Sequence, residues 1–428
     1  MFLRFTVGNY RSIKEKQTLS MVAGSGRDEL GGVFDSGLKD IQLVPVAAIY
    51  GANASGKTNI LSALEFMVEA VMLSQREWKP EGIDDYEPFV LDVEYVARPS
   101  FFEIDFIFDE IRFTYGFELD AKKIVAEWLH AYPKGRKQVW LNREGPEFYF
   151  GSHLTGENRS IQKLTRTNSL FLSAAAQSGH EVLSKIYDFF VEKIVFEDPL
   201  YERAHFKASI KMLEQPYFGE LIAQIMRTAD LGITSARVVR PNETQIQLFD
   251  RELEKRGISA KARARRISEL EDVVFTHQGD GGNSADISYF DESEGTQTLF
   301  TLSSRLLMTQ LNGGILCIDE FESSLHPEIC KRIIDAFRDP KKNLFNAQLI
   351  FTTHNTRLLQ KDTLRRDEVW FTEKSEGGAT TLYPLTDFHP RKNENRELGY
   401  LQGRYGAVPL IDQNDFLATR GDADGETR

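Results

Sequence analysis

The chain has 428 residues, enough for two or three domains or for one large domain with insertions. Its composition, 41% hydrophobic and 27% charged, is typical of a globular protein that can build a core. The net charge of −12 argues against a protein that coats nucleic acid, because neutralising phosphates needs clustered lysine and arginine, although a local basic patch stays open.

The cysteines and the N-terminus indicate the compartment. Cys317 and Cys330 lie in apolar surroundings, without the spacing of a zinc site or a disulfide framework, which fits a reducing cytoplasm. The N-terminal "MFLRFTVGNYRSI" alternates like a strand and lacks the apolar core of a signal peptide. No apolar run reaches about 18 residues, so we expect no membrane span.

The N-terminal half predicts two kinds of sheet. Residues 1–22 form two short strands around the turn "GNYRS", and the apolar "LVPVAAIYG", residues 43–51, predicts a strand buried on both faces. From Thr58 to Leu73, apolar side chains recur at helical spacing. Period-two alternation across 89–150 then predicts an antiparallel meander, with strands at 89–97, 101–109, 111–120, 124–133 and 137–145.

The second half begins with helical patterns at 160–230. Residues 250–271 are strongly charged, with seven basic residues from Arg251 to Arg266. The last eleven residues, "ATRGDADGETR", have the composition of a disordered end. Between them we expect a hairpin at 273–291, a helix from about Thr296 to Leu311, a strand at 314–320, a helix at 327–337 and a strand at 347–354.

A phosphate-binding loop stands between the apolar strand and the first helix. The pattern G-x-x-x-x-G-K-T occurs at Gly51, Gly56, Lys57 and Thr58. In such a loop backbone N–H groups surround the phosphates, the lysine neutralises the β and γ oxygens, and the threonine hydroxyl binds Mg²⁺. We therefore predict a nucleotide site formed by Asn53, Ala54, Ser55, Gly56, Lys57, Thr58 and Asn59.

Two later strands end in residues suited to that site. In "GILCIDEFESSLHP", Asp319 would bind the metal and Glu320 would orient and deprotonate the attacking water. In "LIFTTHN", the imidazole of His354 could stabilise charge beside the γ-phosphate, although a histidine after a strand is also a common cap or packing residue.

A helix start at Ser293-Glu294-Gly295 adds a second anion site. Ser293 is the natural N-cap, and a helix N-terminus favours negative charge. This site has no evident use inside its own subunit, whose phosphates already have the P-loop.

In this order, the P-loop, the Ser-x-Gly helix start, the Asp-Glu strand end, "SSLH" and the histidine resemble the ABC-type head of the SMC and RecF-like ATPases. More narrowly, the chain is similar to the bacterial AAA-labelled ATPases of phage-defence and abortive-infection loci, the RloA-like group. The resemblance covers almost the full length and is carried by "GANASGKTNIL", "TADLGI", "ESEGTQTLF", "CIDEFESSLHP", "FTTHN" and "RKNENRELGYLQGRYGAVPLI". It implies an α/β fold, a P-loop NTPase of ABC/SMC–RecF type with a mixed sheet, a flanking antiparallel meander and a short helical insertion lobe.

The resemblance implies ATP and Mg²⁺ as ligands and assigns roles residue by residue. Asp319 and Glu320 would be the Walker B metal ligand and catalytic base, beside Lys57 and Thr58, and His354 would be the switch. Arg11 would approach the nucleotide from the N-terminal turn. Gln177, in "FLSAAAQ", is the candidate Q-loop residue that links the metal to the helical lobe.

Ser293 and Gly295 would form the signature that closes on ATP bound to a second protomer. The sequence departs here from the common Leu-Ser-Gly-Gly-Gln, because Glu294 replaces a glycine. ATP sandwiched between two subunits would make binding drive a homodimer or a higher homo-oligomer, and hydrolysis would release it.

The expected domains follow from these motifs. They are a first ATPase lobe at 1–175, a helical insertion at 176–275, a second ATPase lobe at 276–388 and a C-terminal extension at 389–428.

Partners are expected from the same resemblance. Relatives of the overcoming-lysogenization-defect type carry a C-terminal Toprim nuclease, but too few residues follow His354 for one here. We therefore expect an anti-phage ATPase that controls a separately encoded effector, with a Toprim-like nuclease as the candidate.

Other interpretations stay open. A RecF-like DNA-repair ATPase is the main alternative, and a transporter ATPase subunit is the third. The basic stretch 251–266 is either a contact for nucleic acid or a solvated helix face. The C-terminal block either docks a partner or packs on the body of the protein.

Overall fold

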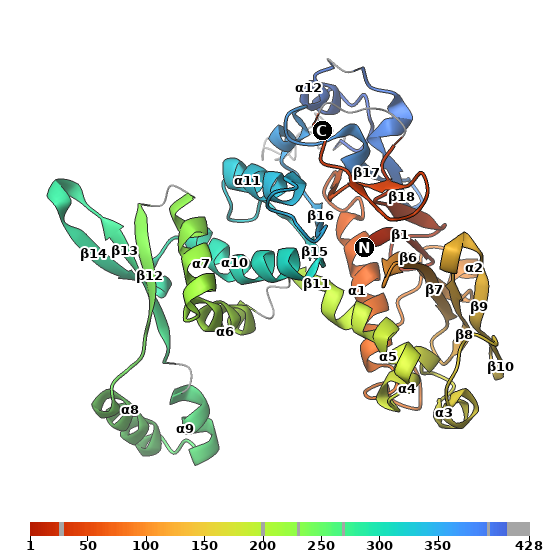
Figure 1. Cartoon of the computed structure of the whole chain (residues 1–428), viewed down its shortest axis with the longest axis horizontal. Helices are drawn as coiled ribbons and strands as arrows, with labels where there is room; N and C mark the ends of the chain where they lie inside the picture. The colour runs from red at the N-terminus through yellow and green to blue at the C-terminus, as the bar shows by residue number, and fades with distance from the viewer. Residues whose placement is uncertain (25–29, 198–201, 229–231, 268–269, 392–393, 409–428) are drawn as a thin grey trace, which may run out of the picture.

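The computed structural model describes residues 1–24, 30–197, 202–228, 232–267, 270–391 and 394–408. The expected disordered end lies outside these ranges, as do parts of 228–233 and 391–411, which carry the family resemblance. Two large sheets form the body, and a smaller sheet projects from it with two helices (Figure 1). Within the described part of the chain, no helix is both long and apolar enough to cross a membrane.

A six-stranded mixed sheet carries the P-loop. Its order is β11-β15-β16-β5-β17-β18, and the strands run parallel except β18, which pairs antiparallel with β17. The strands are β5 (Val46–Gly51), β11 (Ile194–Glu197), β15 (Ile315–Ile318), β16 (Gln348–Thr352), β17 (Val369–Lys374) and β18 (Thr380–Pro384).

Both faces of β5 are buried, as its apolar sequence predicts. Ala47 and Ile49 belong to one hydrophobic cluster, together with side chains of α1. Val46, Ala48 and Tyr50 belong to another cluster, together with side chains of α10 and α11. The helices are α1 (Lys57–Leu73), α10 (Glu294–Asn312) and α11 (Pro327–Arg338).

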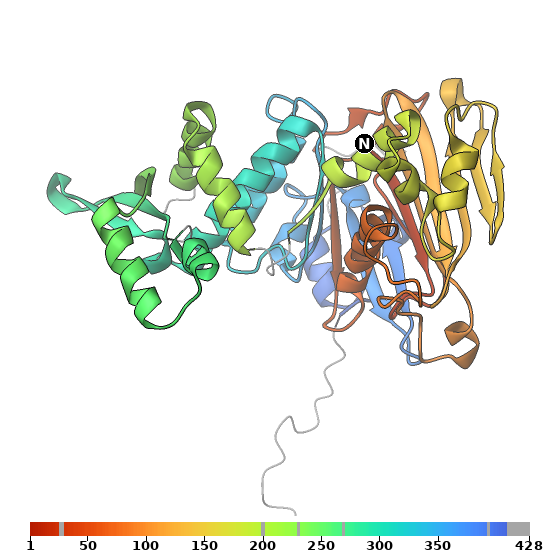
Figure 2. The same ribbon diagram turned by 90° about the horizontal axis from the view of Figure 1, so that it is seen from below.

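A seven-stranded antiparallel sheet covers the other side of α1, which lies between the two sheets (Figure 2). Its order is β10-β9-β8-β7-β6-β1-β2. The strands are β1 (Phe2–Gly8), β2 (Gln17–Ser20), β6 (Ser100–Phe108), β7 (Ile111–Leu119), β8 (Ile124–Ala131), β9 (Gln138–Glu144) and β10 (Glu147–Phe150). The predicted α/β class, with a mixed sheet and a flanking antiparallel meander, is confirmed.

The strand expected at 89–97 is wrong. This segment crosses the N-terminal turn, where the amide of Phe89 donates to Asn9 Oδ1 at 3.0 Å, and it ends in α2 (Val93–Val96), capped by Asp92. Phe89 and Tyr95 are buried, but Val93 between them is 87% exposed, so the alternation does not mark one buried face. The remaining short elements outside the insertion are β3 (Phe34–Asp35), β4 (Gln42–Leu43), α3 (Asn158–Leu164) and α12 (Arg396–Leu401).

The insertion is only partly helical. After α4 (Phe171–Gln177), which overlaps its expected start, it contains α5 (Glu181–Asp188), α6 (Glu202–Leu213) and α7 (Pro216–Thr228). An antiparallel sheet follows, formed by β12 (Ile233–Val239), β13 (Asp272–Gln278) and β14 (Ser284–Ser288). Between β12 and β13, α8 (Glu243–Lys255) and α9 (Ala260–Ile267) lie at the end of the insertion that points away from α1 (Figure 1).

The predicted hairpin at 273–291 corresponds to β13 and β14, whereas β12 was not predicted. The domain limits at 175, 275 and 388 stay a prediction. One strand of the expected insertion, β11, pairs with β15 and so belongs to the mixed sheet.

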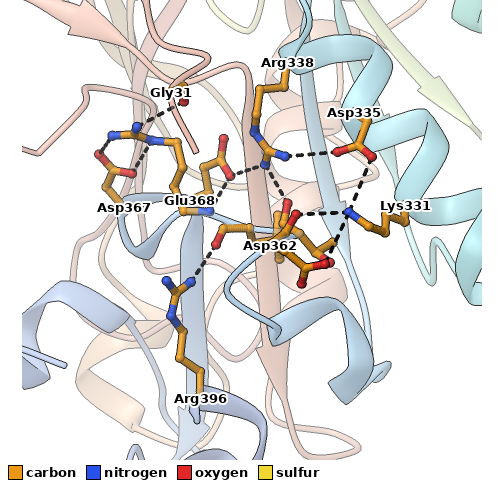
Figure 3. A network of polar contacts seen from close by, with 11 residues as sticks. Gly31, Lys331, Asp335, Arg338, Asp362, Asp367, Glu368 and Arg396 are labelled. Carbon is orange, nitrogen blue, oxygen red and sulfur yellow. Dashed lines mark hydrogen bonds and ion pairs between the residues drawn. The ribbon is translucent and has the colours of Figure 1, made fainter. Parts of the chain in front are cut away.

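A buried charge network anchors the C-terminal end of α11 (Figure 3). Arg338 donates to Glu368 Oε2 and to the carbonyl of Thr363, both at 2.7 Å, and Glu368 is fully buried at the start of β17. Beside this pair, Arg365 makes a two-bond contact with Asp367. The network fixes α11 against the sheet, and α11 directly follows the loop that carries Asp319 and Glu320.

Removing Glu368 is therefore expected to destabilise the fold. The change Glu368→Ala leaves Arg338 as a buried charge without its carboxylate and should lower the free energy of unfolding by about 3–5 kcal/mol. Asp335→Ala is the matched control, because Asp335 contacts the same arginine but is 47% exposed, and it should cost less than about 1 kcal/mol. Denaturant unfolding measures both values, and equal losses would contradict the assignment.

Candidate functional site

The P-loop runs from β5 to α1 in a conformation that its glycine requires. Gly56 caps α1 at φ 103, and a Cβ there would lie 2.1 Å from Thr380 Oγ1. Ala54 also has a positive φ of 62, and it lies with Asn53 in the exposed part of the loop. The loop thus exposes its backbone in front of the helix N-terminus, the arrangement that binds phosphate.

Hydroxyl groups from segments distant in the sequence hydrogen-bond to this loop and to its flanking residues. Ser55 Oγ lies 2.7 Å from Thr372 Oγ1, which donates to the carbonyl of Tyr50. Thr380 Oγ1 donates to the carbonyl of Ser55 at 2.8 Å and lies 2.7 Å from Ser12 Oγ, which also accepts from the side chain of Asn59. Sequence reasoning missed Ser12, Thr372 and Thr380, because only the pairing of β5 with β17 brings the two threonines to the loop.

Lys57 is folded back onto its own loop. Its Nζ donates to the carbonyls of Gly51 at 2.9 Å and Ala52 at 3.1 Å, and the residue is 6% exposed. Burial lowers the pKa of Lys57, whereas the carboxylates of Asp319, Glu322 and Glu320 raise it. The ammonium group is therefore the positive charge at the centre of an otherwise acidic site.

Asp319 reaches the P-loop from two strands away. It follows β15, and β16 lies between β5 and β15 in the sheet. Thr58 Oγ1 nevertheless donates to Asp319 Oδ2 at 2.9 Å, and Thr352 Oγ1 of β16 donates to Asp319 Oδ1. The carboxylate and the hydroxyl expected to share a metal thus lie in contact.

These donors fit Mg²⁺. Both are hard oxygen ligands, and magnesium in phosphate-binding sites uses one or two protein groups together with waters and substrate phosphates. Among the described residues no group of three or more histidine, cysteine or carboxylate side chains could hold a metal.

Glu320 follows Asp319 in an unusual backbone conformation. Its φ is 49, and its amide donates to Thr352 Oγ1 at 2.8 Å. Such a conformation costs a non-glycine residue on the order of 1 kcal/mol and is often found at functional sites. The side chain is exposed at the ends of the parallel strands, where ligands bind in open α/β sheets.

His354 lies among the same charged groups. Burial and the Lys57 ammonium lower its pKa below the ordinary value, against the opposing effect of the carboxylates of Glu322, Glu320 and Asp319. The lowered pKa favours the neutral imidazole, which can still donate a hydrogen bond from its ring N–H.

The helix start at Ser293 lies next to the loop after Glu320. Ser293 Oγ accepts from the amide of Thr296 at 3.2 Å, as expected for an N-cap. A Cβ on Gly295 would lie 2.6 Å from the carbonyl of Ser324, so glycine permits this close approach. Ser293 and Glu294 are exposed, which leaves the helix N-terminus accessible to another molecule.

Two predicted residues do not meet the P-loop. Arg11 forms an ion pair with Glu87, and its guanidinium lies 5.3 Å from the ring centre of Tyr10. Gln177 is exposed on α4, which meets the far end of α1, where the amide of Gln75 donates to Ser173 Oγ at 3.3 Å. Because α1 has 17 residues, that end lies about 25 Å from the P-loop.

One family model matches most of the chain. It is described as "AAA domain, putative AbiEii toxin, Type IV TA system" and matches residues 46–360, from the first residue of β5 to beyond His354. No curated protein matches the chain.

Several solved structures are similar at low identity. An Smc head bound to the C-winged helix domain of ScpA shares 13% identity and a TM-score of 0.41, covering 89% of this chain and 96% of that one. An Smc head with an extended coiled coil, bound to the C-terminal domain of ScpA derived from Pyrococcus furiosus, shares 13% identity at a TM-score of 0.38, with coverages of 94% and 99%. The protein cbiO1 from Clostridium perfringens, part of the ABC transporter complex cbiONQ, shares 13% identity at a TM-score of 0.29, with coverages of 95% and 98%.

Proposed function

The chain belongs to this AAA-domain family, and we propose that it binds and hydrolyses ATP and uses the nucleotide to control its assembly. The observation that carries the proposal is the contact of Thr58 with Asp319, which joins the P-loop to a motif 261 residues later. Glu320 and His354 lie at the same edge of the sheet, so nucleotide-binding and hydrolytic groups converge there.

Each side chain has a defined task in this proposal. Lys57 leaves the carbonyls of Gly51 and Ala52 to neutralise the phosphate oxygens of ATP. Thr58 and Asp319 would hold Mg²⁺, which when bound would supply positive charge beside the phosphates. Glu320 orients the attacking water and accepts its proton, and His354 donates a hydrogen bond toward the γ-phosphate.

We further propose that ATP is shared between two copies of the chain. The exposed N-terminus of α10, with Ser293 and Gly295, would close on the phosphates held by the P-loop of a second protomer. Nucleotide binding would then favour the dimer, and hydrolysis would release it.

A mixing experiment tests the shared site. Lys57→Ala loses the P-loop half and Ser293→Arg blocks the helix half, so each variant alone should be inactive. Mixed in equal amounts, they should recover up to about half of the wild-type rate, because only mixed dimers contain an intact site and each retains one intact site of two. A mixture as inactive as its components would exclude a shared site, provided both variants are folded by circular dichroism.

The biological role that we propose is anti-phage defence, with a separately encoded effector such as a Toprim-like nuclease under nucleotide control. The description of the matched family as a toxin of a toxin–antitoxin system supports a two-component arrangement. Co-purification from the native locus, with ATP or ADP present, tests this part. A chain that protects cells without any neighbouring gene would count against it.

A RecF-like role in DNA repair is the alternative. It is favoured by α9, which has no buried residue and carries Lys261, Arg265 and Arg266. Against it, Arg263 on the same helix pairs with Asp250 at 2.8 Å, as expected for a solvated helix in a charged hairpin. Salt-dependent DNA binding that is lost on neutralising these cations would favour repair.

A further inference from the structure

Glu322 lies two residues beyond the proposed catalytic base and contacts the proposed switch. Its Oε1 accepts a hydrogen bond from the backbone amide of His354. This contact crosses from the loop after β15 to the loop after β16. It is a charge-assisted bond, the stronger class of hydrogen bond to a backbone donor.

The second oxygen of the same carboxylate is buried without a hydrogen-bond partner among the described residues. Buried polar atoms in folded proteins are rarely left unpaired, and an exception often marks a functional group. The carboxylate lies within electrostatic reach of Lys57, whose ammonium uses two of its three protons on loop carbonyls. A buried acceptor without a donor therefore lies within electrostatic reach of a donor that has one proton unused by these bonds.

The residues around His354 are fixed by other contacts. Thr353 donates from its amide to the carbonyl of Ile49 at 3.0 Å, which ties the segment to β5. Tyr50 donates from its hydroxyl to the carbonyl of Asn355 at 3.3 Å. The amide of His354 itself is held by Glu322, so this carboxylate sets the direction in which the histidine leaves the strand.

We propose that Glu322 is a positioning residue that couples His354 to the loop carrying Asp319 and Glu320. The inference rests on the proposed role of His354 in ATP hydrolysis. One carboxylate oxygen holds the histidine backbone, and the other keeps an acceptor in the site for Lys57 or for an ordered water. Movement of the loop after β15 is then passed directly to the switch histidine.

Steady-state ATP hydrolysis by single and double variants tests the coupling. Glu322→Ala should lower kcat by about 10- to 100-fold, the effect expected when a reacting group is misplaced by about an ångström. The KM for ATP should change less than about threefold, because the P-loop is untouched. Glu322→Gln keeps an oxygen acceptor for the His354 amide and should restore most of the rate. Glu328→Ala, an exposed carboxylate nearby on α11, is the control that should leave the rate unchanged.

A double-mutant cycle separates positioning from a merely structural role. If Glu322 acts through His354, the variant Glu322→Ala/His354→Ala should be no slower than the slower single variant. The inference would be overturned if the loss of kcat in the double variant equalled the product of the losses in the two single variants. It would also be overturned if the Tm of Glu322→Ala fell far enough to account for its lost rate. If His354→Ala lowers kcat and Glu322→Ala does not, the inference about Glu322 fails, while the proposed role of His354 stands. If His354→Ala hydrolyses ATP at the wild-type rate, both the inference about Glu322 and the proposed role of His354 fail.

Discussion

Replacing Glu320 by glutamine is expected to slow ATP hydrolysis by at least about 100-fold while leaving ATP binding intact. The change removes the carboxylate that would accept the proton of water but keeps the size of the side chain. The backbone should not move, because the amide of Glu320 is held by Thr352 Oγ1 at 2.8 Å. ATP should therefore accumulate in the closed site and hold two protomers together.

Sedimentation velocity with and without ATP measures this accumulation, alongside phosphate release. Glu320→Gln should sediment as a dimer with ATP and as a smaller species without it. Glu376→Gln, an exposed carboxylate in the turn between β17 and β18, is the matched control and should behave as the wild type. Hydrolysis by Glu320→Gln at the wild-type rate would exclude Glu320 as the base. A sedimentation coefficient that is the same with and without ATP would exclude nucleotide-driven dimerisation.

The sequence predicted the parts of the site that are local. Gly51 to Thr58 form one turn between a strand and a helix, and Asp319 with Glu320 ends another strand. Such motifs depend on neighbours in the chain, so apolar periodicity and spacing were enough to find them. The same holds for the meander strands from β6 to β9, where alternation reflects one face on the core of α1.

What the sequence could not supply depends on pairing between distant segments. Thr372 and Thr380 support the P-loop only because β17 lies beside β5, and nothing near them marks that contact. The position of β16 between β5 and β15 is also a matter of strand order. Glu322 was overlooked because its importance rests on a contact with the amide of His354, in the next strand's loop.

Two other expectations depended on sequence patterns that more than one structure can produce. The alternation at 89–97 resembles that of a strand, yet the segment is pinned by Asn9 and capped by Asp92. Gln177 was chosen for its place after an alanine-rich run. The run belongs to the buried helix α4, in which the amides of Phe171 and Leu172 donate to Glu127, and its last residue, Gln177, is exposed.

Lys57→Ala is expected to abolish ATP binding. The lysine supplies the central positive charge of a site that also contains Asp319, Glu320 and Glu322. Without it, the phosphates of ATP would approach three carboxylates with no cation from the P-loop to offset them. At ATP about 100 times above its Kd, the wild type should gain about 2.7 kcal/mol of stability from binding, and the variant almost none.

Thermal unfolding with and without ATP measures this difference. The comparison is internal to each protein, so the loss of two hydrogen bonds to the carbonyls of Gly51 and Ala52 cancels from it. Lys374→Ala removes an exposed lysine from β17 and should keep the full shift. If ATP raised the Tm of Lys57→Ala as much as that of the wild type, the Lys57 ammonium would not contact the nucleotide. Because dimerisation is proposed to require bound ATP, the same variant should also stay a monomer at ATP concentrations that dimerise Glu320→Gln, which ties assembly to the charge of one side chain.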